Sequence, residues 1–327
     1  MVGLIEVEEA VQTLIAGGVV GIPTETVYGL SADGLSAQSV ARLFAVKDRP
    51  ADNPLILHVA DLSAALPLWS LTPRDQRRVE RLASLWPGPM TVVLPAADHV
   101  PAIVTAGLRT VAVRVPNHPV TQRILRGVGR PLAAPSANRS GRPSPTTAMH
   151  VLDDLADAID GVVDGGPCSV GVESTVVDLY SEVPRILRPG AIGQDALSDV
   201  LGEAVTAYAA DPTAGSPGLR HRHYRPTIDR VVRLVDASEA WRSSDALLLF
   251  ASTAGRLVSE YGIRTAPTEV LPDDPAGAMR ALYGCLRRCE GLSVDTLQVE
   301  LPPREGVWEA LHDRLVRAVG DVYGHPS

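Results

Sequence analysis

Residues 21–58 read GIPTETVYGLSADGLSAQSVARLFAVKDRPADNPLILH, and this stretch decides the fold of the chain. The short apolar run that ends at Pro23 indicates a buried strand. Ser36 is the expected N-cap of a helix that continues to Val46. The apolar run over residues 55–59 predicts a second strand. The segment is therefore expected to fold as strand, polar turn, helix, basic turn and strand.

The two turns of this segment contain hydroxyl groups and cations. Thr24, Glu25 and Thr26 follow the first strand, and Lys47 and Arg49 stand at the end of the helix. A crossover connection brings the carboxyl ends of two strands together at one edge of a sheet. We therefore expect one crevice to be lined by Thr26, Lys47, Arg49, Asn53 and His58.

Lys47 is the only lysine in the chain. Every other lysine or arginine position in the chain is an arginine. The single lysine therefore indicates a function that needs a compact ammonium group rather than a planar guanidinium. The alternative interpretation is that Lys47 and Arg49 are solvated cations at a helix end and have no role in a site.

The composition indicates a globular protein of two domains. The chain has 327 residues, of which 45% are hydrophobic, enough for two cores. A formal net charge of -8 argues against the broad basic surface of a nucleic-acid-binding protein, so an anion site must be a local pocket. The three cysteines lack the spacing of a metal site and are expected to be buried. No apolar run is long enough to span a membrane, and the N-terminal segment is acidic, so we expect a cytoplasmic protein.

Residues 110–116, TVAVRVP, alternate in the way a strand does. The three valines share one face of the expected strand, whereas Thr110, Ala112 and Arg114 share the other. A strand on the protein surface would show the same pattern, so the alternation alone does not make Arg114 a binding residue.

Two loops are rich in small and polar residues. Residues 131–147, PLAAPSANRSGRPSPTT, predict a short strand and a hydroxyl-rich loop that ends at a helix N-cap, Ser144 or Thr146. Residues 165–178, GGPCSVGVESTVVD, predict a glycine-rich loop that leads into a strand. Such loops present backbone N–H groups that can approach a phosphate closely. The sequence contains no P-loop and no GxGxxG motif, which excludes two common nucleotide-binding folds.

The character of the chain changes at about residue 203. Residues 203–226 end in SPGLRHRHYRP, a basic and aromatic segment in an otherwise acidic chain. A nucleic-acid contact is one interpretation of this segment. Beyond it, strand signals at 231–235, 246–250 and 297–301 alternate with helix signals near 276–288 and 306–319, which is typical of a small parallel α/β domain.

Several of these motifs, in this order, resemble those of the threonylcarbamoyl-AMP synthase family, whose catalytic domain is called YrdC-like. The matching strings are PTETVYGL, K-x-R-P, NPLILH, WPGPMT, SAN-x-SG, G-x-x-S-T-V-V-D, and S-P-G followed by H-Y-x-P. The resemblance implies an α/β protein in three parts. These are a YrdC-like twisted open mixed sheet with flanking helices over residues 1–202, a linker that serves as an active-site flap over 203–226, and a smaller Rossmann-like α/β C-terminal domain over 227–327.

The resemblance also implies a reaction. The family is a group of nucleotidyltransferases that join L-threonine, bicarbonate and ATP into L-threonylcarbamoyladenylate and release pyrophosphate. Mg²⁺ is expected to accompany ATP, without a metal site built from protein side chains. The product is expected to pass to a downstream tRNA threonylcarbamoyl transferase complex, which modifies the adenosine beside the anticodon. Cations and N–H donors are the groups that such chemistry needs.

Matching positions to motifs gives each site residue an expected role. Lys47 and Arg49 are expected to be catalytic. The L-threonine pocket is expected to consist of Thr26, His58, Arg114, Ser136 and Ser174. ATP is expected to contact Lys47, Arg49, Asn53, Thr110, Asn138, Thr146, Arg188 and Tyr224.

Three other classes of protein remain as alternatives. The chain could be an RNA-binding module, a nucleotide-binding subunit without turnover, or an adenylating ligase for a different amino acid. The acidic charge speaks against strong direct binding of nucleic acid, and no membrane association is expected. Pyrophosphate release that depends on threonine distinguishes these alternatives from the synthase.

Overall fold

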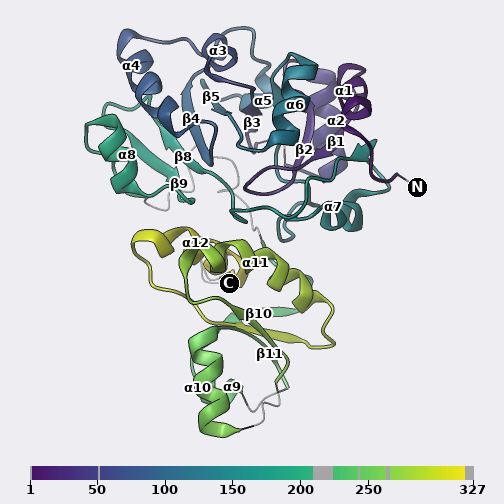
Figure 1. Cartoon of the computed structure of the whole chain (residues 1–327), viewed down its shortest axis with the longest axis vertical. Coiled ribbons are helices and arrows are strands. Elements are labelled where there is room, and N and C mark those ends of the chain that lie inside the picture. The colour runs from purple at the N-terminus through teal and green to yellow at the C-terminus, as the bar shows by residue number, and fades with distance from the viewer. Residues whose placement is uncertain (1, 51, 209–223, 242–243, 263–265, 321–327) are drawn as a thin grey trace. The chain divides into compact units, whose positions relative to one another are not determined.

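The computed structural model describes residues 2–50, 52–208, 224–241, 244–262 and 266–320. The chain divides into two compact units, Met1–Ser140 with Pro145–Arg220, and Gly141–Ser144 with His221–Ser327. Each unit has its own sheet (Figure 1). Most of the predicted flap over residues 203–226 lies outside the described residues. Within the described ranges, no helix is both long and apolar enough to cross a membrane.

The first unit is built on a mixed sheet, as predicted. The order of its described strands is β7-β1-β2-β6-β3-β5-β4-β8-β9. The sheet contains both parallel pairs, such as β3 with β5, and antiparallel pairs, such as β4 with β5. The strands are β1 (Val20–Ile22), β2 (Gly29–Asp33), β3 (Ile56–His58), β4 (Met90–Pro95), β5 (Thr110–Arg114), β6 (Leu132–Ala133), β7 (Gly161–Val162), β8 (Thr175–Asp178) and β9 (Arg185–Arg188).

Helices cover both faces of this sheet. On one face Leu14 and Ile124, from the neighbouring helices α1 and α6, belong to one apolar cluster with Leu132 of β6. On the other face Leu43 belongs to the main core together with Leu30 of β2. The described helices of this unit are α1 (Val7–Ile15), α2 (Ala37–Lys47), α3 (Leu62–Ala65), α4 (Pro73–Leu82), α5 (Ala102–Thr105), α6 (Pro119–Val128), α7 (Ala148–Leu155) and α8 (Gln194–Leu201), with short 3-10 turns η1 (Leu66–Leu68) and η2 (Ala83–Leu85).

The helix predicted at the centre of the deciding stretch is confirmed as α2. The Ser36 hydroxyl accepts a hydrogen bond from the Ser39 backbone N–H at 3.2 Å, which is the expected N-cap contact. The helix ends at Lys47, one residue later than predicted. Asp48 then takes a left-handed backbone conformation with φ of 50°, which stops the helix before the proline.

The prediction of a crossover between the two flanking strands was wrong. Strand β2, which the sequence analysis missed, is antiparallel to both β1 and β6, and β6 is antiparallel to β3. β1 and β3 therefore run in opposite directions, and their carboxyl ends lie at opposite edges of the sheet. β2 has the sequence GLSAD and lacks β-branched residues, so its strand character comes from pairing on both sides rather than from its own propensity.

The alternation predicted for residues 110–116 is confirmed in β5. Val111, Val113 and Val115 belong to the main core. Ala112 points to the opposite face, where it joins a small apolar cluster with Ile56 of β3 and other strand residues. Because Arg114 is two residues from Ala112, it projects from that same face.

The second unit contains a parallel sheet, as predicted, with the order β10-β13-β11-β12. The sequence analysis found three of these strands but missed β12 and the helix α10. The described elements are β10 (Arg230–Arg233), α9 (Ala237–Ala240), β11 (Ala246–Phe250), α10 (Ala251–Tyr261), β12 (Thr268–Leu271), α11 (Pro275–Glu290), β13 (Thr296–Val299), the 3-10 turn η3 (Gly306–Trp308) and α12 (Glu309–Val319).

The N-cap predicted at Ser144 or Thr146 was misplaced. The residue that caps α7 is Thr147, whose hydroxyl accepts from the His150 backbone N–H at 3.3 Å. The PSPTT run offers several residues of suitable chemistry, and the structure uses the last of them.

Candidate functional site

A row of polar side chains crosses the centre of the first sheet. In the strand register His58 stands opposite Arg114, and Arg114 stands opposite Thr91. The Thr91 and Ser174 hydroxyl oxygens lie 2.8 Å apart, which extends the row toward β8. Paired residues of neighbouring strands project from the same face, so these four side chains share one surface of the sheet.

Arg114 is the cation at the centre of this row. Its Nη1 donates to the Thr26 hydroxyl at 2.8 Å, and its Nε donates to the Gly88 carbonyl at 3.2 Å. Its Nη2 forms an ion pair with a Glu25 carboxylate oxygen at 2.7 Å. Only 3% of Arg114 is exposed, so these contacts fix the guanidinium in a nearly water-free setting.

His58 is a neutral imidazole at physiological pH. Burial lowers its pKa to about 3, and the positive charge of Arg114 adds to this effect. Its Nδ1 lies 3.3 Å from the Ile56 carbonyl oxygen, which can only accept a hydrogen bond. Nδ1 therefore carries the proton, and Nε2 is a bare acceptor.

Arg188 lies at the end of the row next to Ser174. Its Nε and Nη2 donate to the Ser174 carbonyl at 3.1 Å and 3.0 Å, and Nη2 also contacts the Ser174 hydroxyl at 3.1 Å. Two predicted site residues that are 14 positions apart in the sequence are thus in direct contact.

Lys47 organises a second group of predicted residues. Its ammonium donates to the backbone carbonyls of Ser136 and Asn138, in the SAN-x-SG loop. Burial lowers the pKa of Lys47 well below its ordinary value, and the nearby Arg49 lowers it further. The alternative of a solvated lysine at a helix end is excluded, because only 1% of Lys47 is exposed.

Arg49 turns back onto the chain that follows it. Its Nε donates to the Asn53 carbonyl at 3.2 Å, and its Nη2 donates to the Pro54 carbonyl at 2.9 Å. Arg49 and Asn53 are therefore neighbours, and their contact shapes the turn between α2 and β3.

The two groups meet through the loop that contains Thr26. The Ala137 backbone N–H donates to the Tyr28 carbonyl at 2.8 Å, and Gly29 forms a β-bridge with Ser136. The loop that contacts Arg114 thus adjoins the loop that Lys47 holds. The tertiary fold thus brings the Arg114 group and the Lys47 group together, although the predicted crossover between β1 and β3 is absent.

Three predicted residues lie apart from these contacts. Thr110 is half-buried at the start of β5, and the Thr146 backbone N–H contacts His150 Nδ1 at 3.2 Å. Tyr224 belongs to the second unit, where its ring lies 5.4 Å from that of Tyr283. The contacts of all three with ATP stay predictions.

Two residues of the site were not singled out from the sequence. Glu25 was noted only as part of the PTET motif, and Thr91 only as part of the WPGPMT turn. A signal for Thr91 existed, because its hydroxyl interrupts a strand of otherwise apolar residues. For Glu25 the signal was a carboxylate between two threonines directly after a buried strand.

The described residues include other side chains that could bind a metal or act as nucleophiles. In the described part of the chain, no group of three or more His, Cys, Asp and Glu side chains could hold a metal ion. The three cysteines are free and buried, as predicted. Burial raises the pKa of Cys168 to about 12, so this thiol is not an activated nucleophile.

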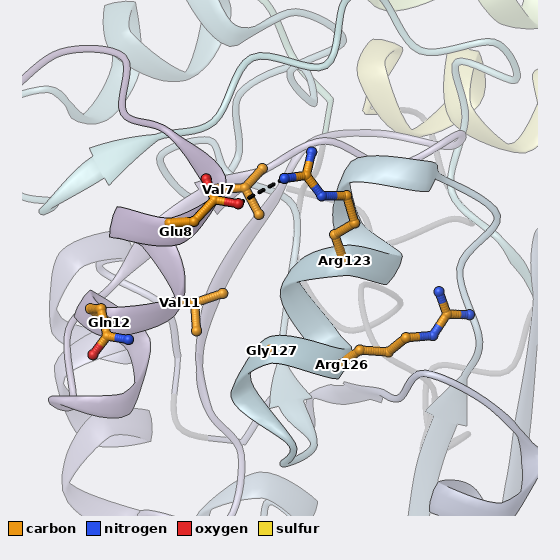
Figure 2. Close-up of a pocket in the computed structure, with 7 residues that line it drawn as sticks. All are labelled: Val7, Glu8, Val11, Gln12, Arg123, Arg126 and Gly127. Carbon is orange, nitrogen blue, oxygen red and sulfur yellow. Dashed lines mark hydrogen bonds and ion pairs between the residues drawn. The ribbon is translucent and has the colours of Figure 1, made fainter.

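A surface hollow lies between α1 and α6 (Figure 2). It is lined by Val7, Glu8, Val11, Gln12, Arg123, Arg126 and Gly127. Glu8 and Arg123 form an ion pair of 2.7 Å across it, and both side chains are well exposed. This hollow contains none of the predicted residues.

The mixed sheet with its buried polar row makes the first unit an α/β protein, and it matches the class named for Sua5, yciO and yrdC. The family model for this class, described as telomere recombination, matches residues 12–190. A second model, described as the C-terminal domain of threonylcarbamoyl-AMP synthase, matches residues 192–320. The chain belongs to the threonylcarbamoyl-AMP synthase family and is therefore a transferase of the nucleotidyltransferase type.

Individual relatives agree with this assignment. The chain is 39% identical to a threonylcarbamoyl-AMP synthase of Pyrococcus abyssi, over 93% of this chain and 91% of the relative. It is 37% identical to that of Bacillus subtilis, over 96% of this chain and 93% of the relative. A crystal structure of P. abyssi Sua5 complexed with L-threonine superimposes with a TM-score of 0.86 and 34% identity, covering 98% of this chain and 97% of that one.

Proposed function

We propose that this enzyme condenses L-threonine, bicarbonate and ATP into L-threonylcarbamoyladenylate and releases pyrophosphate. The observation that carries the proposal is the buried Arg114, held between Thr26 and the polar row, beside the loop fixed by Lys47. The family membership and the similarity to a protein solved with L-threonine support the choice of amino acid.

The polar row supplies the groups that L-threonine needs. A guanidinium binds a carboxylate through two parallel N–H donors, and Arg114 is the buried guanidinium of the row. The bare Nε2 of His58 can accept a hydrogen bond from the threonine hydroxyl. Thr26, Ser136 and Ser174 would complete the pocket with short polar side chains.

ATP would bind next to this pocket, along the loop held by Lys47. Lys47 fixes the backbone of residues 136–138 through the carbonyls of Ser136 and Asn138, which would position the Asn138 side chain for contact with ATP. Arg49, Asn53, Asn138 and Arg188 would add charge and hydrogen bonds, together with Thr110, Thr146 and Tyr224. Mg²⁺ would enter with ATP, bound by its phosphates and by water.

The reaction needs two bond-forming steps. The threonine amine attacks the bicarbonate carbon, and water leaves to give the carbamate. A carbamate oxygen then attacks the α-phosphorus of ATP, and the bond to pyrophosphate breaks. In this step the anionic carbamate approaches the anionic α-phosphate. Cations and N–H donors that are already in position lower the energy of the transition state, because the protein need not reorganise as charge develops.

The product would pass to a tRNA threonylcarbamoyl transferase complex, and the reaction would take place in the cytoplasm. The division into a catalytic domain (1–202), an active-site flap (203–226) and a C-terminal domain (227–327) stays a prediction, and most of the flap lies outside the described residues.

Pyrophosphate release tests the proposed function. The wild type should release pyrophosphate only when ATP, L-threonine and bicarbonate are all present. Arg114→Ala and Lys47→Ala should each lower kcat/KM by at least about 100-fold, the usual loss for a removed transition-state donor. Arg123→Ala, which removes an exposed arginine of α6, is the matched control and should retain activity.

The opposite result favours the alternative of a nucleotide- or RNA-binding module without turnover. In that case ATP would bind, but pyrophosphate release would be absent or indifferent to threonine and bicarbonate. Stimulation by a different amino acid would instead indicate another adenylating ligase.

A further inference from the structure

Glu25 is a buried carboxylate whose hydrogen-bonding capacity is not used. Only 5% of the residue is exposed. Its one ion pair is with Arg114, yet among the described residues neither carboxylate oxygen has an aligned hydrogen-bond donor. A buried carboxylate is costly unless donors satisfy its lone pairs. The site therefore lacks a donor that a ligand can supply.

The backbone around Glu25 is rigidly placed. The Val170 N–H donates to the Glu25 carbonyl at 2.7 Å, and the Gly171 N–H donates to the Thr26 carbonyl at 3.1 Å. The Thr24 hydroxyl also accepts from the Val27 backbone N–H at 3.2 Å. These contacts hold the backbone of the Glu25 loop in place, which gives the buried side chain a fixed point of attachment, as a binding site requires.

Arg114 retains donors for a second partner. A guanidinium has five N–H donors, and the hydrogen bonds to Gly88 and Thr26 engage one on Nε and one on Nη1. The Glu25 oxygen lies 2.7 Å from Nη2 without an aligned N–H, so one hydrogen on Nη1 and both on Nη2 are left for an incoming carboxylate. The paired charges at this point are thus a cation with free donors and an anion with free acceptors.

This pairing matches an α-amino acid. The ammonium and carboxylate groups of an amino acid are attached to the same carbon, so a complementary site needs opposite charges side by side. Glu25 and Arg114 provide opposite charges 2.7 Å apart. A site for a simple carboxylic acid would need only the arginine.

We propose that Glu25 binds the ammonium group of the amino-acid substrate while Arg114 binds its carboxylate. Glu25 then orients the nitrogen that forms the carbamate and selects against acids without an amino group. This inference rests on the proposed function, because it deepens the description of the same pocket.

Binding of two ligands to the same variants tests the inference. The ligands are L-threonine and (R)-3-hydroxybutanoate, which keeps the carboxylate and hydroxyl but lacks the ammonium, and affinity is measured by isothermal titration calorimetry. Glu25→Gln should weaken L-threonine at least about tenfold relative to (R)-3-hydroxybutanoate. Arg114→Ala should weaken both ligands, and Glu8→Gln, at an exposed carboxylate, should change neither.

The possible outcomes distinguish a failure of the Glu25 proposal from a failure of the proposed function. If Glu25→Gln changes both affinities by the same factor, Glu25 only holds Arg114, and the inference is overturned while the proposed function stands. If the wild type binds no L-threonine, the proposed function fails as well. Should Glu25→Gln not fold, Glu25→Asp keeps the charge on a shorter side chain. It should still weaken L-threonine more than the acid, and an equal change would overturn the inference.

Discussion

Individual residues of the site show how buried charge is kept in a folded protein. Lys47, Arg114 and Arg188 are all buried, and each donates hydrogen bonds to backbone carbonyls or hydroxyls. Such contacts offset the cost of removing a cation from water, which is otherwise several kcal/mol. The cations therefore stay in place before any substrate anion arrives, and binding need not reorganise them.

The neutral state of His58 predicts an acid-sensitive fold. Its pKa is about 3 when folded and near its ordinary 6.5 when unfolded. Between these values the unfolded chain binds the additional proton, so His58 makes stability fall as the pH drops from about 6.5 toward 3. The slope it adds is at most about 1.4 kcal/mol per pH unit. His58→Asn should remove this contribution and flatten the fall, measured by urea unfolding at pH 7, 6 and 5.

The exposed His99→Asn is the control for this measurement and should keep the wild-type slope. Parallel stability curves for His58→Asn and the wild type would contradict the account of His58 as a buried neutral base.

At the scale of elements, the junction of β8 and β9 positions Ser174. Gly190 follows β9 and lies against the start of β8. A Cβ added to Gly190 would lie 2.3 Å from the Thr175 nitrogen and 2.7 Å from the Ser174 carbonyl carbon. Since both are backbone atoms, they cannot rotate away, and glycine is required for this close approach.

Gly190→Ala should therefore shift β8 and move Ser174 away from Thr91. We expect a loss of roughly 1–3 kcal/mol in the free energy of unfolding, as for overpacked cores, and weaker binding of L-threonine. Thermal unfolding and calorimetric titration measure the two effects.

The matched control is Gly255→Ala, in helix α10, where a Cβ meets nothing within 4 Å. This change should stabilise its unit by about 0.5–1 kcal/mol, because alanine favours a helix over glycine. Wild-type stability and affinity in Gly190→Ala would show that β8 tolerates the extra atom.

At the scale of the whole molecule, a strongly acidic chain contains a strongly cationic site. The formal net charge is -8, yet the site gathers Lys47, Arg49, Arg114 and Arg188. The cations are effective because they are concentrated in a buried region of low dielectric rather than spread over the surface. The field of the whole protein therefore favours small anions in a pocket over a long polyanion on the outside.

This charge distribution predicts weak binding of free tRNA. Fluorescence anisotropy with labelled tRNA at physiological salt should give a dissociation constant weaker than about 10⁻⁴ M, the upper limit of ordinary non-specific binding. A known tRNA-binding protein serves as the positive control. A tighter complex whose affinity falls steeply with salt concentration would indicate several phosphate contacts and favour the RNA-binding alternative.

The sequence predicted most features that depend on neighbouring residues. The N-cap at Ser36, the alternation of β5 and the parallel strands of the second unit all follow from local chemistry and periodicity. It failed at β2, whose strand state depends on two partners distant in sequence. It also failed at the N-cap of α7, where several residues of equal chemistry compete.

For the site, the sequence by itself determined which groups are present, because motif spacing and residue chemistry are local properties. Only the tertiary structure decided which groups meet. Thr26 contacts Arg114 although 88 residues separate them, and Glu25 gains its role from that contact. The burial of Lys47 is likewise decided by a loop far along the chain. Long-range pairing and burial arise from packing the whole sheet, and no short stretch of sequence encodes them.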